Sequence, residues 1–169
     1  MAKPIAVIVH HEAGNNGFVF VNQFHKDKWN FKSSLGFYAG YQYYWDKNTG
    51  WHQARAEDET GAHTLDGWNT KSVGICMMGN YEREKLTDEA KAQLRTKIDE
   101  VRARWGIPRH MVFGHFEKQP SKPTACPASI MEFVREYRQG NILEELQRQV
   151  DELKQRLMEL IKKLNALKK

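Results

Sequence analysis

The stretch GHFEKQPSKPTACP, Gly114 to Pro127, places a histidine and a cysteine at the two ends of a proline-broken segment. The apolar residues MVF just before it predict a short strand, and PASIMEFVREY just after it predicts a helix with Pro127 in its first turn. His115 would then leave the end of a strand while Cys126 enters a helix, so that the two side chains could face one another across a small cavity. A third ligand from elsewhere in the chain would complete a metal site there.

The composition limits what can surround this stretch. A chain of 169 residues with 40% hydrophobic residues is long enough for one compact domain with a core, plus an appendage. There is no apolar run of roughly 18 residues, so no membrane span is expected, and MAKPIAVIVHH lacks the pattern of a secretory signal. Two cysteines far apart give no disulfide framework, which favours synthesis in the cytoplasm. The net charge of +5 would suit an anionic polymer, but such a modest surplus more often forms a solvated face, and no nucleic-acid partner is predicted.

The N-terminal segment offers the third ligand. Ile5 to Val9 is a continuous apolar run that is typical of a strand buried on both faces, and it leads directly into His10 and His11. Successive side chains of a strand point to opposite faces, so only one of these histidines should reach a metal. Either one, with His115 and Cys126, would form a set of two imidazoles and one thiolate, which catalytic zinc uses with an open fourth position.

The middle of the chain predicts a helix, a hairpin and another buried strand. Val21 to Trp29 has the spacing of a short helix, whose His25 is expected to pack or hydrogen-bond at the helix surface rather than to bind metal. Ala39 to Arg55 alternates aromatic and polar residues around the turn KNTG, which predicts a hairpin with most of its rings in the core. Ser72 to Met78 predicts a buried strand in which Cys76 is a small core residue.

Two further elements follow before the opening stretch. Leu86 to Trp105 predicts the best helix of the domain, with Thr87 as its N-cap and Gly106 ending it. His110 to Phe113 predicts the last strand.

The composition changes at Gly140. Beyond it the apolar residues alternate spacings of three and four, at Leu143, Leu146, Val150, Leu153, Leu157, Leu160, Leu164 and Leu167. This strict period predicts a coiled coil that joins copies of the chain through residues 141–169. The positions that flank this apolar stripe carry lysine and arginine but no acid, so a parallel dimer would place like charges together. Ile142 and Ile161 widen the apolar face, which favours a higher-order or antiparallel coiled coil. The alternatives are an amphipathic helix on a membrane surface, which the acids along the polar face disfavour, and an engineered or fused segment.

Four motifs, in this order between residues 5 and 138, carry a family resemblance: IVHHEAG, AGYQYYWDKNTGWHQAR, GAHTLDGWNTKSVGICMMGNY, and GH followed by TACP. Together they resemble the zinc-dependent N-acetylmuramoyl-L-alanine amidases of type 2, whose fold is shared by phage amidase lysins and peptidoglycan recognition proteins. The resemblance implies an α/β fold with a mixed central β-sheet flanked by helices. It places a catalytic domain at residues 1–140, followed by the coiled-coil helix of residues 141–169.

The resemblance also implies roles for individual residues. Its zinc ligands correspond to His10, His115 and Cys126, and His10 is preferred to His11 because the family's ligand directly follows the apolar strand. The remaining positions correspond to Tyr41 and Thr124 in catalysis and to His63, Trp68 and Asn69 in substrate binding.

The chain departs from the family in two places. The interval from His115 to Cys126 is longer than usual, which predicts a bulge around Pro120 and Pro123, and Gln42 replaces a histidine that the family commonly has.

The function implied is hydrolysis of the amide bond between N-acetylmuramic acid and L-alanine in bacterial peptidoglycan. A phage endolysin made in the host cytoplasm without a signal peptide, and acting on the cell wall, would fit this pattern. One alternative is a non-catalytic peptidoglycan-binding module oligomerised by its tail, which the presence of Cys126 and Tyr41 disfavours. Another is an oligomeric scaffold whose activity is secondary. Glu12 and Glu117 are both plausible as the group that transfers protons.

Overall fold

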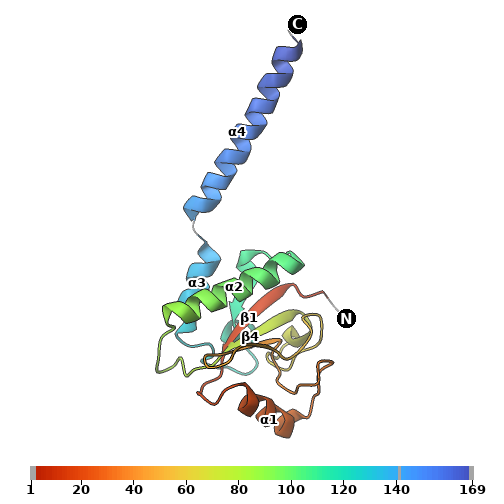
Figure 1. Cartoon of the computed structure of the whole chain (residues 1–169), viewed down its shortest axis with the longest axis vertical. Helices are drawn as coiled ribbons and strands as arrows, with labels where there is room; N and C mark the ends of the chain where they lie inside the picture. The colour runs from red at the N-terminus through yellow and green to blue at the C-terminus, as the bar shows by residue number, and fades with distance from the viewer. Residues whose placement is uncertain (1–2, 141, 168–169) are drawn as a thin grey trace. The chain divides into compact units, whose positions relative to one another are not determined.

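A mixed five-stranded sheet forms the centre of the N-terminal part of the protein (Figure 1). The structure is a computed structural model that describes residues 3–140 and 142–167. The strand order is β3-β2-β4-β1-β5. The strands are β1 (Ala6–His11), β2 (Tyr43–Asp46), β3 (Gly50–Gln53), β4 (Ser72–Met77) and β5 (Val112–Gly114). Strand β1 pairs in parallel with β4 and β5, β2 pairs in parallel with β4, and β3 pairs antiparallel with β2. The predicted α/β fold with a mixed central sheet is therefore confirmed.

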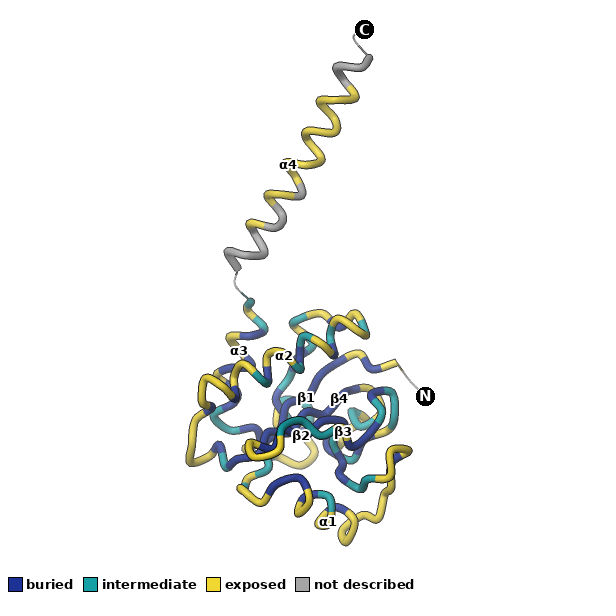
Figure 2. Tube along the Cα trace, viewed as in Figure 1, coloured by how far each residue is buried: buried dark blue, intermediate teal, exposed yellow. Residues whose placement is uncertain are grey.

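The two central strands are buried along their whole length (Figure 2). This explains why β1 and β4 are continuous apolar runs rather than alternating ones. Strand β1 extends beyond the expected Val9 and includes both His10 and His11. Strand β5 is shorter than expected, because Arg109–Met111 forms a 3-10 turn, η2, before it.

Three helices cover the sheet: α1 (Phe18–Trp29), α2 (Asp88–Trp105) and α3 (Ile130–Gln139). Helix α2 begins and ends as predicted, because the Thr87 side chain accepts a hydrogen bond from the backbone N–H of Ala90 and Gly106 adopts a left-handed conformation. Helix α1 starts earlier than predicted. Its first residue, Phe18, donates its N–H to the Asp46 carboxylate, 3.0 Å away, so a strand distant in sequence supplies the cap.

The expected helix after Cys126 begins later than predicted. Ala128 has a φ of 56°, which is not helical, so residues 127–129 form a turn and α3 starts at Ile130. Pro127 therefore lies before the helix rather than in its first turn. Two more 3-10 helices, η1 (Trp68–Thr70) and η3 (His115–Lys118), lie in the loops that follow the hairpin and β5.

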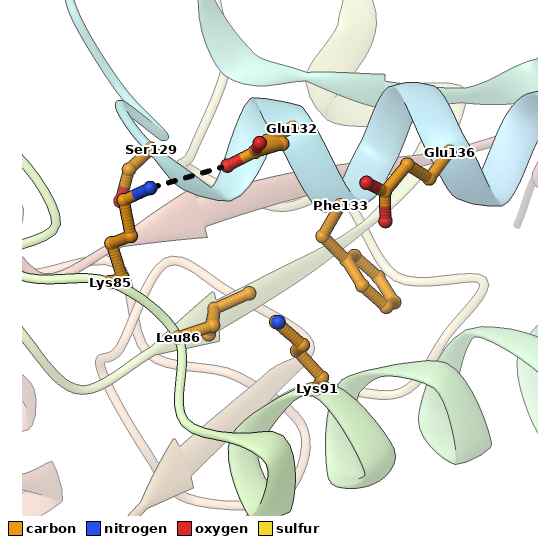
Figure 3. A pocket seen from close by; sticks show the side chains of 7 residues that line it. All are labelled: Lys85, Leu86, Lys91, Ser129, Glu132, Phe133 and Glu136. Carbon is orange, nitrogen blue, oxygen red and sulfur yellow. Dashed lines mark ion pairs between the residues drawn. The ribbon is translucent and has the colours of Figure 1, made fainter.

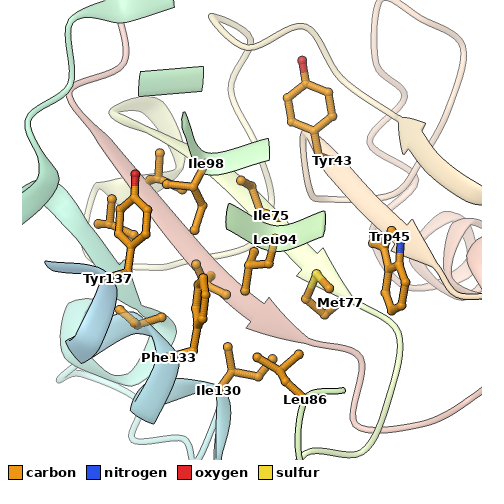
Figure 4. Close-up of a cluster of buried hydrophobic side chains, with 14 of the residues drawn as sticks. Tyr43, Trp45, Ile75, Met77, Leu86, Leu94, Ile98, Ile130, Phe133 and Tyr137 are labelled. Carbon is orange, nitrogen blue, oxygen red and sulfur yellow. The ribbon is translucent and has the colours of Figure 1, made fainter. Parts of the chain in front are cut away.

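Two hydrophobic clusters lie on opposite faces of the sheet. The larger one packs α2 and α3 onto the sheet, with Leu94, Ile98 and Phe133 among its buried side chains (Figure 4). The smaller one packs Phe18 and Val21 of α1 onto the other face. The hairpin contributes to both clusters, since alternate aromatic side chains point to opposite faces.

Residues Gln139–Lys169 form a second compact unit that is built on helix α4 (Ile142–Leu167). The large apolar residues whose burial the structure describes in this helix are exposed, from 43% at Val150 to 66% at Met158 (Figure 2). The side chains of Leu143, Leu146, Leu164 and Leu167 lie outside the described residues. The predicted C-terminal helix is present, while its pairing with other copies stays a prediction. Among the helices that the structure describes, none combines the length and apolarity that a membrane span needs.

Candidate metal centre

The end of β1 brings the predicted ligands together. Val9 pairs with Gly114 across the parallel strands β1 and β5, so the residues that follow, His10 and His115, lie side by side with ring centroids 4.4 Å apart. The segment before α3 returns to the same place and adds Cys126. One donor atom from each of these three side chains lies within 4.8 Å of the others, the arrangement that a metal ion requires.

His11 points to the other side of the sheet, as strand alternation predicts. Its Nδ1 accepts a hydrogen bond from the backbone N–H of Tyr81, 3.2 Å away. Its own backbone N–H donates to the Cys126 sulfur at 3.3 Å. The structure therefore turns the His10 side chain toward Cys126, while His11 contributes only its backbone.

The two histidines of this group are held in the neutral form that binds a metal cation. Burial lowers the pKa of His10 well below its ordinary value, and His115 and His63 nearby lower it further. Burial also lowers the pKa of His115, so both imidazoles are neutral near pH 7 and have a lone pair to offer. Burial raises the pKa of the Cys126 thiol to about 12, against the opposing hydrogen bond from His11. A thiolate at this position needs a positive ion to stabilise it, and two neutral imidazoles with a thiol are a donor set that fits zinc.

A second layer of contacts orients His10. Its Nε2 lies 3.1 Å from Nδ1 of His63, while its Nδ1 faces the sulfur of Cys126 at 3.8 Å. His63 is buried, and its Nδ1 also contacts the Thr64 hydroxyl at 2.9 Å. Strand β4 makes room for this ring with Gly74, because a Cβ there would lie only 2.7 Å from the imidazole. When His10 offers Nδ1 to a metal, its Nε2–H can donate to His63, which fixes the tautomer.

The long loop between the second histidine and the cysteine has its own anchor, Gln119. Its side chain is buried, and Oε1 accepts hydrogen bonds from Nε2 of His115 at 2.9 Å and from the backbone N–H of Leu65 at 3.0 Å. Its Nε2 donates to the carbonyl of Lys122 at 2.8 Å. The bond from Nε2 of His115 to Gln119 places the ring proton on Nε2 and leaves Nδ1 of His115 unprotonated. Sequence reasoning missed Gln119, and the only available signal was that a lengthened loop needs an internal hydrogen-bond partner.

A cavity of about 540 Å³ opens beside the three donors. Tyr41 lies half-buried in its wall, with its ring centroid 5.1 Å from that of His10, and burial raises the pKa of its hydroxyl well above the ordinary value. The Thr124 hydroxyl accepts a hydrogen bond from the N–H of Cys126 at 3.2 Å, which leaves its own proton free to donate. The described lining residues are Lys28, Trp29, Phe31, Tyr41, Ala62, His63, Thr64, Leu65, Asn69, His115, Gln119, Lys122, Pro123 and Thr124.

The residues expected to bind substrate occupy different places. His63 and Asn69 both line the cavity, and Asn69 also supports the loop by accepting the backbone N–H groups of His63 and Thr64 at 2.7 and 2.8 Å. Trp68 is not among the lining residues. It packs against Phe113, with ring centroids 6.1 Å apart.

The two acids considered for proton transfer also differ. Glu117 accepts the backbone N–H of Gly114 at 2.8 Å and pairs with Arg138 at 2.9 Å, so its carboxylate is engaged in holding the loop. Glu12 accepts the Tyr44 hydroxyl at 2.8 Å and lines a second cavity that also touches Tyr41. Glu12 also accepts from the backbone and side chain of Asn16, so both carboxylates are engaged and the proton-transfer role of either stays a prediction.

A third, smaller cavity of about 210 Å³ lies between α2 and α3 (Figure 3). Its two lysines and two glutamates balance in charge, and Lys85 pairs with Glu132 at 3.9 Å. It contains no histidine or cysteine among its described lining residues, so it offers none of the chemistry gathered at His10.

Comparison with known proteins places this geometry in a family. Residues 1–129 match the family model described as N-acetylmuramoyl-L-alanine amidase. The chain is 26% identical over 127 residues to peptidoglycan-recognition protein SC2 of Drosophila melanogaster, covering 72% of this chain and 67% of that protein.

Solved structures share the fold. N-acetylmuramoyl-L-alanine amidase LysC from Clostridium intestinale superposes with a TM-score of 0.64 at 22% identity, covering 78% of this chain and 83% of that one. Drosophila PGRP-LB superposes with a TM-score of 0.62 at 20% identity, covering 76% and 78%. Since the family match spans most of the sequence, this chain belongs to the N-acetylmuramoyl-L-alanine amidase family.

Proposed function

We propose that the protein is a zinc-dependent amidase that hydrolyses the bond between N-acetylmuramic acid and L-alanine in bacterial peptidoglycan. The observation that carries the proposal is the group of His10, His115 and Cys126 donors beside a cavity whose lining includes Tyr41 and Thr124. Membership of the family supports action on peptidoglycan or binding to it. The cysteine donor and the adjacent tyrosine favour hydrolysis over binding alone.

His10, His115 and Cys126 would hold the zinc ion. When bound, zinc supplies a Lewis acid for the amide carbonyl and lowers the pKa of a water molecule to about 7. The chain's own contribution is to keep both imidazoles neutral and correctly oriented. His63 accepts from His10 and Gln119 accepts from His115, so each ring presents its Nδ1.

Tyr41 and Thr124 would act on the substrate. Negative charge develops on the carbonyl oxygen as the amide is attacked, and a hydroxyl donor in a partly desolvated wall stabilises that charge. The raised pKa keeps Tyr41 protonated across the neutral range, so it can donate throughout. One such donor contributes about 3 kcal/mol to the transition state.

Purified protein offers a direct test. Zinc content is measured first, and the protein is then incubated with purified cell walls while free N-terminal L-alanine is quantified. Equimolar zinc and release of L-alanine N-termini, both abolished by a chelator and restored by added zinc, are the expected results. Retention on the walls without release would identify a binding module instead.

We also propose that the C-terminal helix joins several copies of the chain. Its exposed apolar side chains, including Leu153, Leu157 and Leu160, would be covered in a coiled coil. Linking several catalytic domains would raise avidity for a polymeric wall, as suits an endolysin-like enzyme. Solution mass measured with and without residues 141–169 tests this. A full-length protein with the mass of a single chain would refute the proposal. A shortened chain that keeps the same number of copies per particle would refute it as well.

A further inference from the structure

A second cavity adjoins the one beside the metal donors. Its volume is about 350 Å³, and it shares Lys28, Trp29 and Tyr41 with the larger cavity. The rest of its wall comes from α1 and the loop before it, through Glu12, Asn16, Phe20, Val21, Phe24 and His25. Because Tyr41 lines both cavities, one ligand could pass the reacting centre and occupy the two together.

Aromatic side chains of α1 line this second cavity. Phe20 and Phe24 lie one helical turn apart on α1, with ring centroids 6.3 Å apart and planes within 7° of parallel. They are 52% and 49% exposed. Lys28, one turn further on, places its Nζ 5.4 Å from the Phe24 ring and 5.0 Å from the Trp29 ring. Large aromatic rings that line a cavity and stay this exposed are typical of a binding surface.

Polar groups line the same cavity. The Glu12 carboxylate accepts hydrogen bonds from Asn16 and from the Tyr44 hydroxyl, and its half-buried side chain still faces the cavity. Flat apolar rings together with a carboxylate and an amide in one cavity match a ligand that has apolar ring faces and hydroxyl or amide edges. Sugars have this character. An anionic membrane does not fit as well, since a recessed carboxylate would repel its head groups.

We propose that this cavity is a glycan subsite, which holds the sugars of the glycan strand next to the muramoyl group while the larger cavity holds the stem peptide. The identity of the glycan rests on the proposed function. Phe20 and Phe24 stack on the faces of the sugar rings. The Glu12 carboxylate accepts hydrogen bonds from the sugar hydroxyls, and the Asn16 side-chain amide donates to them.

The double variant Phe20→Ala/Phe24→Ala tests the subsite by kinetics. Both residues are exposed and neither belongs to the metal donors or the proposed catalytic pair. The KM for polymeric cell walls should rise about tenfold, as loss of two half-exposed ring faces predicts, while kcat stays unchanged. Hydrolysis of a muramoyl peptide with a single sugar should keep its wild-type rate. The matched control is Val19→Ala/Gln23→Ala, one position earlier on the same helix and outside the cavity, which should behave as wild type.

A binding measurement separates this proposal from the catalytic one. Glycan strands freed of their stem peptides should bind the wild-type and control proteins, and bind the double variant about tenfold more weakly. Equal binding by all three, or no binding by wild type, would overturn the subsite. The subsite would also be overturned if wild type bound anionic phosphatidylglycerol vesicles, the double variant did not bind them, and the two proteins bound glycan equally. Absence of L-alanine release from walls by wild type would refute the amidase proposal, and the glycan assay would still decide the subsite.

Discussion

The two faces of the sheet bury different chemistry, although the same strands supply both. Toward α2 and α3, the side chains of Val7 and Val9 join a large apolar cluster. The alternate residues of β1 face α1, and the last of them is His10, whose ring contacts His63 and Tyr41. Strand alternation therefore separates the part that stabilises the fold from the part that carries the proposed chemistry.

This separation means that substitutions on the two faces should be distinguishable. Changes on the α2 and α3 face should alter the free energy of unfolding and leave the chemistry of the folded fraction intact. Changes at the metal donors and at Tyr41, on the α1 face, should alter metal binding or turnover and leave most of the stability intact. A substitution that broke this rule would show that the faces are coupled through the strands.

The largest effect is expected for Cys126→Ser, which replaces the thiolate donor with a hydroxyl that zinc binds poorly. Zinc retention and wall hydrolysis should both be lost, while the chain stays folded because the two side chains are nearly the same size. Metal analysis after gel filtration and a wall-digestion assay provide the measurements. Cys76→Ala is the matched control, since Cys76 is the other buried cysteine, pairs with His10 across β1 and β4, and is not one of the three donors, so this variant should keep its zinc. A Cys126→Ser protein that digests walls at the wild-type rate would refute the ligand assignment.

The next largest effect belongs to the opposite face. Leu94 is completely buried against the sheet, so Leu94→Ala removes apolar contacts and leaves a cavity, at a cost of about 2–5 kcal/mol in the free energy of unfolding. Denaturation in urea measures this, and Val19→Ala, 82% exposed on α1, should change stability by less than about 0.5 kcal/mol. Turnover per folded Leu94→Ala molecule should equal wild type, and a large loss would contradict the separation of the faces.

Tyr41→Phe should lower kcat about a hundredfold, because it removes one hydroxyl donor for the developing oxyanion and keeps the ring. Zinc content and the free energy of unfolding should stay at wild-type values. Tyr38→Phe serves as the control, since Tyr38 lies in the same segment but lines neither cavity near the donors. A kcat within a few fold of wild type would remove Tyr41 from the catalytic pair.

Much of the stabilising face could be predicted from the sequence. Local patterns were sufficient for the buried strand β1, for the Thr87 cap and for the periodic face of α2, because each depends on neighbours in the chain. The hairpin was predicted for the same reason. The early start of α1 was missed, since its cap is Asp46, which no local pattern connects to Phe18.

The site was only partly predictable. The family resemblance indicated His10, His115 and Cys126, and the geometry brings them together. The contacts that orient them were not visible, because His63 meets His10, and Gln119 meets His115, only through the three-dimensional arrangement of loops. Residues of this supporting kind have no characteristic spacing in the sequence.

A pH effect of intermediate size is expected on the α1 face of the metal-free protein. His25 is buried, and its Nδ1 accepts the backbone N–H of Gly40 at 2.9 Å, which requires a neutral ring. Burial, with Lys28 and Arg55 nearby, lowers its pKa to about 4 from the usual 6.5. Between these values the unfolded chain binds the proton and the folded chain does not, so stability falls as the pH falls. From pH 7 to pH 5 this contribution is about 2 kcal/mol.

The variant His25→Gln isolates that contribution, because an amide does not titrate in this range. Urea denaturation of chelator-treated protein at several pH values should give a curve for the variant that is flatter by about 2 kcal/mol over the same interval. Parallel curves for the two proteins would show that His25 is protonated in the folded state or exposed to solvent.

The smallest effect should come from Gln119, which acts on the site through His115. Gln119→Ala removes the acceptor for Nε2 of His115, so the ring is free to turn and to exchange tautomers, and zinc affinity should fall about tenfold. Gln119→Glu keeps an acceptor toward His115 and toward the N–H of Leu65, so its zinc affinity should stay close to wild type, although it loses the donor to Lys122. Competition with a chromophoric chelator measures both affinities without reference to activity. If both variants lose affinity equally, the residue acts by holding the loop between His115 and Cys126 together rather than by orienting the His115 ring.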